Sequence, residues 1–168
     1  MDNKDCICKK PASVFFPHLS PLCKECFNQL LRRRVRKAIR EHGELKPNQK
    51  VFIDGSGALA VLFKSAVTGL PLKFVPKSKA EVIVVGKTAD DEAVEFLEQL
   101  FKGKITKKTK ALNIFANITA KELEKYCELN SIRQEKRQKS ELREALESLD
   151  EKYPGIMFAL RKSRRSMQ

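Results

Sequence analysis

The sequence predicts an α/β protein in which a small parallel sheet is flanked by helices and preceded by a short cysteine-rich module. Three observations lead to this prediction. After residue 45, apolar runs of strand length alternate with amphipathic helical segments, which is the order typical of a parallel sheet. A glycine-rich turn joins the first of these strands directly to a helix. Four of the five cysteines lie within the first 26 residues.

The first elements follow from local patterns. Residues 1–26 are poor in helix formers and contain three prolines, which predicts turns and a hairpin. Apolar residues recur at intervals of three and four over 27–42, and a helix is therefore expected there, ending at Gly43. The apolar run 51–53 predicts a short buried strand, and the helix expected over 58–66 follows it directly.

Strands and helices continue to alternate along the chain. The segments 72–75 and 81–85 predict two more strands, and the second is apolar enough for the middle of a sheet covered on both faces. A helix is expected to begin at Thr88, and 112–116 predicts a fourth strand. Thr119 is followed three residues later by a glutamate, which is the capping box of another helix.

Two more helices are expected near the C-terminus. The first is predicted to turn four apolar side chains inward, those of Leu142, Ala145, Leu146 and Leu149. Pro154-Gly155 ends this helix, because proline and glycine both interrupt helical structure. A last short helix over 156–160 is expected to lead into a basic tail, 161–165.

The composition favours a polyanionic partner. Lys+Arg number 34 against 21 Asp+Glu, which gives a formal net charge of +13. Such an excess creates a long-range field that attracts nucleic acid and, less specifically, anionic membranes. The sequence has no apolar run of membrane-spanning length and no pattern of an export signal. We therefore expect a cytoplasmic, soluble protein that binds nucleic acid and has no membrane partner.

The strongest motif is two close pairs of cysteines. Cys6 and Cys8 are separated from Cys23 and Cys26 by fourteen residues. Each pair can supply two thiolates from one turn, and a hairpin between them would bring the pairs together around a tetrahedral zinc ion. Because the first pair is one residue shorter than the usual spacing, His18 remains an alternative ligand. Such a closed site predicts a structural Zn²⁺ rather than a catalytic one.

The glycine turn after the first strand is a candidate nucleotide-binding site. Gly55, Ser56 and Gly57 lie where the carboxyl end of a strand meets the N-terminus of a helix, and backbone N–H groups there can bind phosphate. The alternative is a tight turn that needs glycine for its geometry. No lysine or arginine lies in the turn, so we expect ATP not to be a cofactor and no catalytic residues to be present.

Basic residues form the third candidate site. On the helix expected over 27–42, one cationic stripe is made of Arg32, Arg33, Arg36, Lys37 and Arg40. A lysine-rich loop adds Lys104, Lys107 and Lys108. These residues are predicted to bind RNA through its phosphates. The chain has no Trp and only two Tyr, so recognition of shape and phosphate is expected rather than base stacking. The remaining cysteine, Cys127, is expected to be a small core residue.

Several segments together resemble the cytoplasmic tRNA 2-thiolation proteins, which belong to the adenine nucleotide α-hydrolase-like ATP-pyrophosphatase group. The N-terminal part of the likeness consists of 22–27, the basic segment 36–40, and 45–51 followed by the glycine turn. The C-terminal part consists of 118–127, 146–149 and 153–155. The resemblance implies a truncated adenine nucleotide α-hydrolase-like fold.

The chain departs from the catalytic members of that family at two points. Their pyrophosphate loop has the form S-G-G-K-D-S, whereas the matching residues 54–59 read D-G-S-G-A-L. They also carry cysteines in the core of the domain, where this chain has only Cys127. The chain therefore resembles a shortened, degenerate second subunit that binds tRNA, partners a catalytic thiolation enzyme and takes no small-molecule substrate.

The resemblance also suggests a domain organisation and leaves two alternatives open. We expect a zinc-binding module at 1–27, a basic linking helix at 28–44, and a degenerate ATP-pyrophosphatase-like domain with a basic tail at 45–168. The first alternative is an active ATP-dependent tRNA thiolation enzyme with a rearranged site. The second is a free-standing zinc-containing RNA-binding protein.

Overall fold

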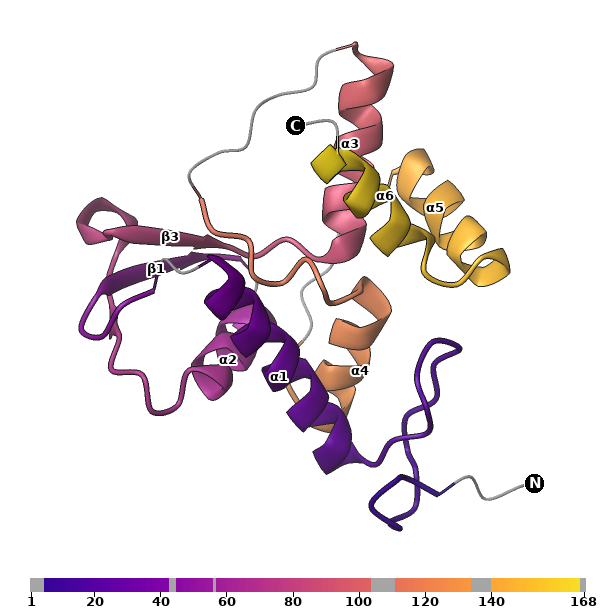
Figure 1. Cartoon of the computed structure of the whole chain (residues 1–168), viewed down its shortest axis with the longest axis horizontal. Helices are drawn as coiled ribbons and strands as arrows, with labels where there is room; N and C mark the ends of the chain where they lie inside the picture. The colour runs from indigo at the N-terminus through magenta and orange to yellow at the C-terminus, as the bar shows by residue number, and fades with distance from the viewer. Residues whose placement is uncertain (1–4, 43–44, 56, 104–110, 134–139, 167–168) are drawn as a thin grey trace.

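A three-stranded parallel sheet lies at the left edge of the molecule in Figure 1, and the helices lie beside it and to its right. The computed structural model describes residues 5–42, 45–55, 57–103, 111–133 and 140–166. The strands are β1 (Lys50–Asp54), β2 (Lys73–Phe74) and β3 (Val82–Val85), in the order β2-β1-β3. The expected small parallel sheet flanked by helices is confirmed.

The middle of this sheet differs from the prediction. Strand β1 is central because Val51, which is fully buried, pairs with Phe74 on one side and Val82 on the other. Within the described residues the apolar strand β3 has only a single bridge on its outer side, between Val84 and Leu112. The fourth strand expected over 112–116 is therefore wrong. The Asn113 side chain accepts the N–H of Phe115 at 3.2 Å, and this local turn takes the chain out of strand conformation.

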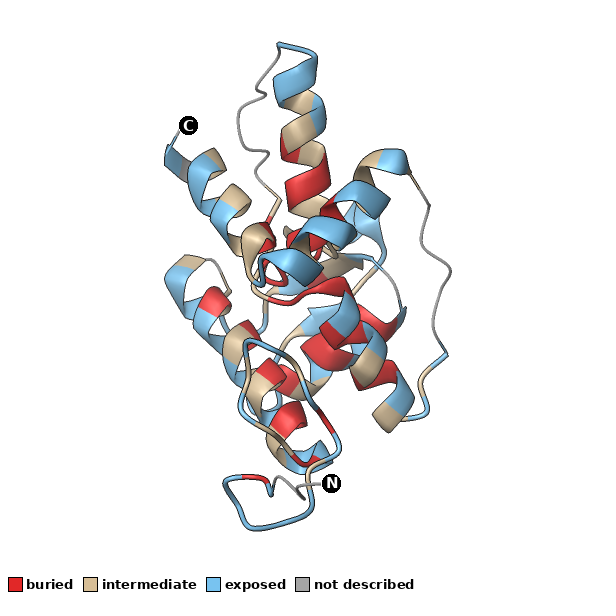
Figure 2. Ribbon diagram, turned by 90° about the vertical axis from the view of Figure 1, so that its right-hand side faces the viewer, coloured by how far each residue is buried: buried red, intermediate tan, exposed pale blue. Residues whose placement is uncertain are grey.

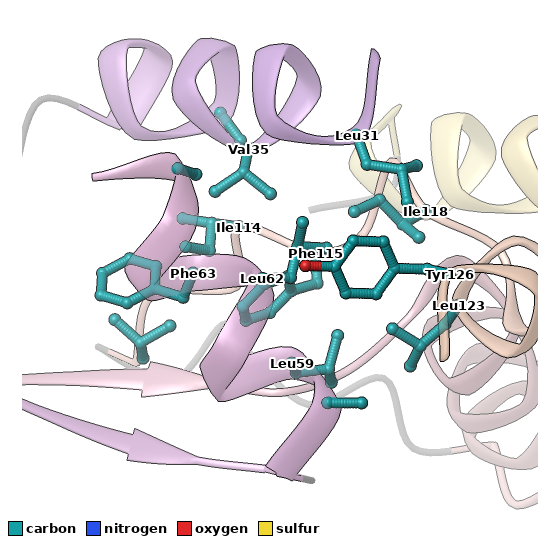
Figure 3. Close-up of a cluster of buried hydrophobic side chains, with 14 of the residues drawn as sticks. Leu31, Val35, Leu59, Leu62, Phe63, Ile114, Phe115, Ile118, Leu123 and Tyr126 are labelled. Atoms are coloured by element: carbon teal, nitrogen blue, oxygen red, sulfur yellow. The ribbon is translucent and has the colours of Figure 1, made fainter. Parts of the chain in front are cut away.

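The main hydrophobic core lies between the sheet and helices α1 (Lys24–His42), α2 (Gly57–Ala66) and α4 (Ala120–Leu129). Figure 3 shows side chains from all three helices meeting in it, among them Leu31, Leu62 and Tyr126. Helix α1 begins three residues earlier than expected because the N–H of Phe27 already bonds the carbonyl of Cys23. Its expected end, Gly43, lies outside the described residues.

A second, smaller core joins helices α3 (Ala89–Phe101), α5 (Glu141–Lys152) and α6 (Ile156–Ser166). Leu146 is buried in it, but Ala145 and Leu149 of the same helix are exposed, which corrects the prediction that both face inward. The reason is that α5 is the outermost helix on the right of Figure 1, where much of its surface is exposed (Figure 2), and it packs on this core through Leu142 and Leu146.

Helix α6 also differs from the prediction, because it continues through the segment expected to be a basic tail. Arg161 and Arg164 lie 3.1 Å from Glu92 and 3.2 Å from Glu95 of α3. These ion pairs hold the last turns of α6 against α3. A short 3-10 helix, η1 (Lys77–Lys79), separates β2 from β3. Among the described residues no helix has the length and hydropathy needed to cross a membrane.

The two expected helix starts at Thr88 and Thr119 are confirmed. The Thr88 N–H donates to the Asp91 carboxylate at 2.9 Å, and the Thr119 N–H donates to that of Glu122 at 2.9 Å. The hairpin expected before α1 is also confirmed, with an antiparallel bridge between Val14 and Leu22. These are local patterns, and each side chain acts within three residues of its own position.

Candidate metal centre and nucleic-acid interface

The four N-terminal cysteines lie together at the start of α1. Their Sγ atoms are all within 4.8 Å of one another, and those of Cys8 and Cys23 are 3.5 Å apart. A single tetrahedral ion with metal–sulfur bonds of about 2.3 Å keeps its sulfurs about 3.8 Å apart. The set formed by Cys6, Cys8, Cys23 and Cys26, which we call the cysteine tetrad, therefore fits one metal ion.

Local backbone structure brings the two pairs together. In the first turn the N–H of Lys9 bonds the carbonyl of Cys6 at 2.7 Å, and Lys9 takes a positive φ of 63°. The hairpin between Val14 and Leu22 then reverses the chain. Cys23 immediately precedes α1 and Cys26 lies in its first turn. The metal site is thus fastened to the helix that carries the basic residues.

The electrostatics of the tetrad favour a cation at its centre. Backbone N–H groups of Cys8 and Cys23 lower the pKa of the Cys6 thiol to about 6. Hydrogen bonds to the sulfurs of Cys6, Cys8 and Cys23 raise the pKa of Cys26 to about 12. Four thiolates this close repel one another, and a bound ion would compensate their charge.

The chemistry of the donor set narrows the kind of metal. Four thiolates are soft ligands of the kind that select zinc or iron–sulfur centres. In a [4Fe–4S] cluster each cysteine binds a different iron at a separate corner of the cluster, so its sulfurs lie farther apart than those around one ion. The close spacing of the sulfurs fits a single ion, and the donor set suits either zinc or an iron–sulfur centre.

His18 is not a neighbour of the tetrad. Its Nε2 lies 3.0 Å from Oε1 of Glu122, in a carboxylate network that sequence analysis missed. Arg34 donates to both oxygens of Glu122 at 2.8 and 2.9 Å, and the Glu122 side chain is fully buried. Phe16 also stacks on Phe27, with ring centroids 6.1 Å apart. The network joins the N-terminal hairpin, α1 and α4, which are far apart in the sequence.

The basic residues of α1 fall into two groups. Arg33, Lys37 and Arg40 are exposed, and we call these three side chains the basic face. Arg36 is also exposed, but it donates from its Nε to the carbonyl of Ala66 at 2.8 Å and so caps the end of α2. Arg32 is half-buried. Lys104, Lys107 and Lys108, the other predicted RNA-binding residues, lie outside the described residues.

The glycine turn is closed by contact with the loop that follows β3. A Cβ atom added to Gly55 would lie 2.7 Å from the Cα of Gly86, and the Gly86 N–H bonds the carbonyl of Asp54 at 2.7 Å. This close approach of two backbones is sufficient reason for glycine at position 55. Gly57 begins α2, and Ser56 lies outside the described residues.

One charged side chain lies close to the glycine turn. A cation does approach the turn from η1, because Lys77 Nζ is 3.4 Å from Asp54 Oδ2. Its ammonium is engaged with that exposed carboxylate.

The fifth cysteine lies outside the tetrad. Cys127 is 3% exposed and packs in the main core, as predicted.

Comparisons with known proteins identify the fold. No protein-family model matches the sequence, and no curated protein matches it. Among solved structures, the chain is similar to the U34-tRNA thiolase NcsA from Methanococcus maripaludis with its [4Fe-4S] cluster. The TM-score is 0.78 at 17% sequence identity, and the match covers 99% of this chain and 88% of the thiolase chain. The chain therefore has a fold similar to that of a tRNA thiolase.

Proposed function

We propose that this chain is a non-catalytic, tRNA-binding subunit of a tRNA wobble-uridine 2-thiolation complex, and that it acts with a catalytic thiolation enzyme. One observation carries the proposal. The chain has a fold similar to that of a U34-tRNA thiolase, matched over 99% of its length. Its β1–α2 turn, however, has the sequence D-G-S-G-A-L, and the backbone at Gly55 is in contact with that of Gly86. Neither feature provides a cation for the phosphates of ATP.

The cysteine count supports the non-catalytic role. We assign a structural Zn²⁺ to the cysteine tetrad because its sulfurs have the spacing that one tetrahedral ion requires. Only Cys127 then remains in the sequence, whereas an iron–sulfur cluster is generally held by about four cysteine thiolates. With the tetrad occupied, this chain has too few cysteines for a second, catalytic cluster.

The tRNA-binding role belongs to the basic face of α1. The Zn²⁺ would order the first turn of α1 through Cys23 and Cys26, and the core holds the helix through Leu31 and Val35. Arg33, Lys37 and Arg40 would therefore meet the RNA on a rigid helix. Their contribution is electrostatic, and it binds and orients the RNA for the partner enzyme.

Exposed apolar side chains support the role of a partner subunit. Phe101 at the end of α3 is 77% exposed, and Leu149 and Tyr153 at α5 are 40% and 65% exposed. Removing such side chains from water is the main driving force of protein association. We assign the catalytic thiolation enzyme to these exposed apolar side chains of α3 and α5.

The test is a pull-down of the tagged full chain from its native cells, followed by protein mass spectrometry, RNA sequencing and metal analysis. We expect a thiolation enzyme, tRNA and one zinc per chain. As a matched variant, the combined change Arg33→Gln, Lys37→Gln and Arg40→Gln should retain the enzyme and recover less tRNA. Recovery of RNA without a thiolation enzyme would favour the free-standing RNA-binding protein and contradict the proposal.

A binding assay separates the proposal from the alternative of an active enzyme. The wild-type chain is titrated with ATP, and no saturable binding is expected. Gly55→Val is unsuitable as a control, because a side chain at Gly55 meets the backbone of Gly86 and would disturb the fold itself. Micromolar ATP binding, or iron instead of zinc in the tetrad, would support the enzyme and contradict the non-catalytic role.

A further inference from the structure

An exposed aromatic ring lies at the edge of the sheet. Phe74 of β2 is 44% exposed, and β2 is an outer strand in the order β2-β1-β3. The ring packs edge-on against Phe63 of α2, with centroids 6.1 Å apart and planes at 88°, and Phe63 is fully buried. A buried aromatic side chain therefore holds Phe74 in place at the surface.

The surroundings of this ring are basic. Lys64 Nζ lies 5.1 Å from the centroid of the Phe74 ring, in a cation–π contact. Lys73 is adjacent in β2 and exposed. The segment 55–80 contains four lysines and no acidic residue. Of these lysines, Lys77 is engaged with Asp54, and Lys79 is exposed.

We propose that Phe74 is a stacking platform for an unpaired base of RNA, and that Lys64 and Lys73 contact the neighbouring phosphates. An aromatic ring beside cations is the arrangement with which proteins bind single-stranded nucleic acid, because every base offers a π-face whatever its identity. The inference rests on the proposed function and extends it. The basic face of α1 binds phosphates alone, whereas this second surface recognises a nucleotide that is not base-paired.

The charge of the surface selects RNA over a protein partner. Val61, 45% exposed on α2, lies one helical turn before Lys64 and enlarges the apolar area. A protein interface would need acidic or neutral groups opposite the lysines, whereas RNA presents a phosphate next to every base. Stacking on Phe74 and neutralisation by Lys64 are therefore satisfied by the same ligand.

The experiment compares two fluorescently labelled RNA hairpins by anisotropy. One has an unpaired loop, and the other has the same stem and an abasic loop, which keeps the phosphates and lacks the bases. The full chain should bind the first hairpin more tightly. Phe74→Leu, which keeps an apolar side chain on Phe63, should weaken binding of the first hairpin about 5- to 100-fold. It should leave binding of the abasic hairpin unchanged.

Two further variants complete the design. Phe15→Leu removes another exposed aromatic ring, 61% exposed in the N-terminal hairpin, and should change neither affinity. Phe74→Trp offers a larger π-face and should bind the loop hairpin at least as well as the wild type. Lys64→Gln should weaken both hairpins, because it removes a phosphate contact that does not depend on the bases.

The outcomes distinguish this inference from the proposed function. If the wild-type chain binds the loop and abasic hairpins equally, or if Phe74→Leu weakens both equally, the stacking role is wrong while RNA binding stands. If the wild-type chain binds neither hairpin, the proposed function itself is wrong. If Phe74→Leu binds RNA normally but no longer co-purifies with a thiolation enzyme, the surface binds protein and the inference is overturned.

Discussion

Helices α1 and α6 are both rich in arginine, and they use it in opposite ways. In α6 the side chains of Arg161 and Arg164 are only 12% and 13% exposed, and each lies beside a glutamate of α3. In α1 the basic face is exposed, and its Lys37 side chain is 67% exposed with only a distant helical contact to Glu41 at 3.7 Å. The same residue types therefore stabilise the fold in one helix and remain available to solvent in the other.

The helix that lies opposite decides the difference. Helix α6 packs along α3, whose first turns supply Asp91, Glu92 and Glu95. Helix α1 packs on α2, which has no acidic residue, and on α4, whose buried Glu122 is taken by Arg34. A basic residue on a helix thus remains available to nucleic acid only where the packed neighbour offers no carboxylate to pair with it.

Removing the metal should have the largest effect, and it should affect the N-terminal hairpin and the start of α1 but not α6. In the described part of the N-terminal module the only buried side chains are those of Val14, Phe27 and two of its own cysteines, so its folding depends on the ion. Chelation should abolish hydrogen-exchange protection of the hairpin amides, such as Val14 and Leu22, and fray the first turn of α1. Protection in α6 should not change.

The matched variant for that experiment is Cys8→Ser, which removes the most exposed ligand of the tetrad. It should reproduce the effect of the chelator. A hairpin that stays protected in the metal-free chain would mean that contacts such as Phe16 on Phe27 hold the module without an ion.

Within α1, replacing Arg34 should cost far more stability than replacing Arg33. Arg34→Gln leaves the fully buried carboxylate of Glu122 without its strongest partner, and loss of one member of a buried ion pair costs about 3–5 kcal/mol. Arg33→Gln changes an exposed side chain and should stay within about 0.5 kcal/mol. Urea unfolding of both variants measures the difference, and equal values would contradict the division of α1 into structural and exposed arginines.

In α6, Arg161→Gln should destabilise the chain by about 1–3 kcal/mol. The Arg161 and Glu92 side chains are 12% and 17% exposed, so the glutamate is left poorly solvated. The Arg161 Nε atom lies 3.1 Å from the Glu92 carboxylate but is not aligned for a hydrogen bond. The expected loss of stability is therefore smaller than for Arg34→Gln. Lys162→Gln, on an exposed side chain of the same helix, is the control and should leave thermal stability unchanged.

Local patterns were predicted well from the sequence, and long-range pairings were not. The capping boxes at Thr88 and Thr119 and the spacing of the cysteine tetrad depend on residues close together in the chain, and their signals are therefore local. The pairing of Arg34 with Glu122 spans 88 residues. The contact between Gly55 and Gly86 exists only because β3 lies beside β1. Neither of these two contacts can be predicted from a single sequence until the arrangement of the strands and helices is known.

The same distinction explains what helical periodicity leaves open. Arg36 is exposed, and its bond to the Ala66 carbonyl depends on where α2 lies; its role in RNA binding stays a prediction. Leu149 was predicted to face inward from helical periodicity alone, and its exposure follows from how few elements pack on α5. Periodicity predicts which face of a helix is apolar, whereas the number of neighbours determines how much of that face is covered.

The smallest expected effect in free energy concerns the basic face, and salt dependence is the readout that reveals it. The combined change Arg33→Gln, Lys37→Gln and Arg40→Gln removes three charges that would otherwise release counterions from RNA. The slope of log K against log salt should become shallower by about 2, and affinity at low salt should fall roughly tenfold.

The control variant removes three positive charges from helices other than α1. Lys102→Gln, Lys152→Gln and Lys162→Gln change exposed lysines at the ends of α3 and α5 and on α6, and the net charge falls by the same amount. If the two triple variants shift the slope equally, only the total charge of the chain attracts RNA. A shift confined to the α1 variant places the phosphates on the basic face, because counterion release depends on where the cations lie and not only on how many there are.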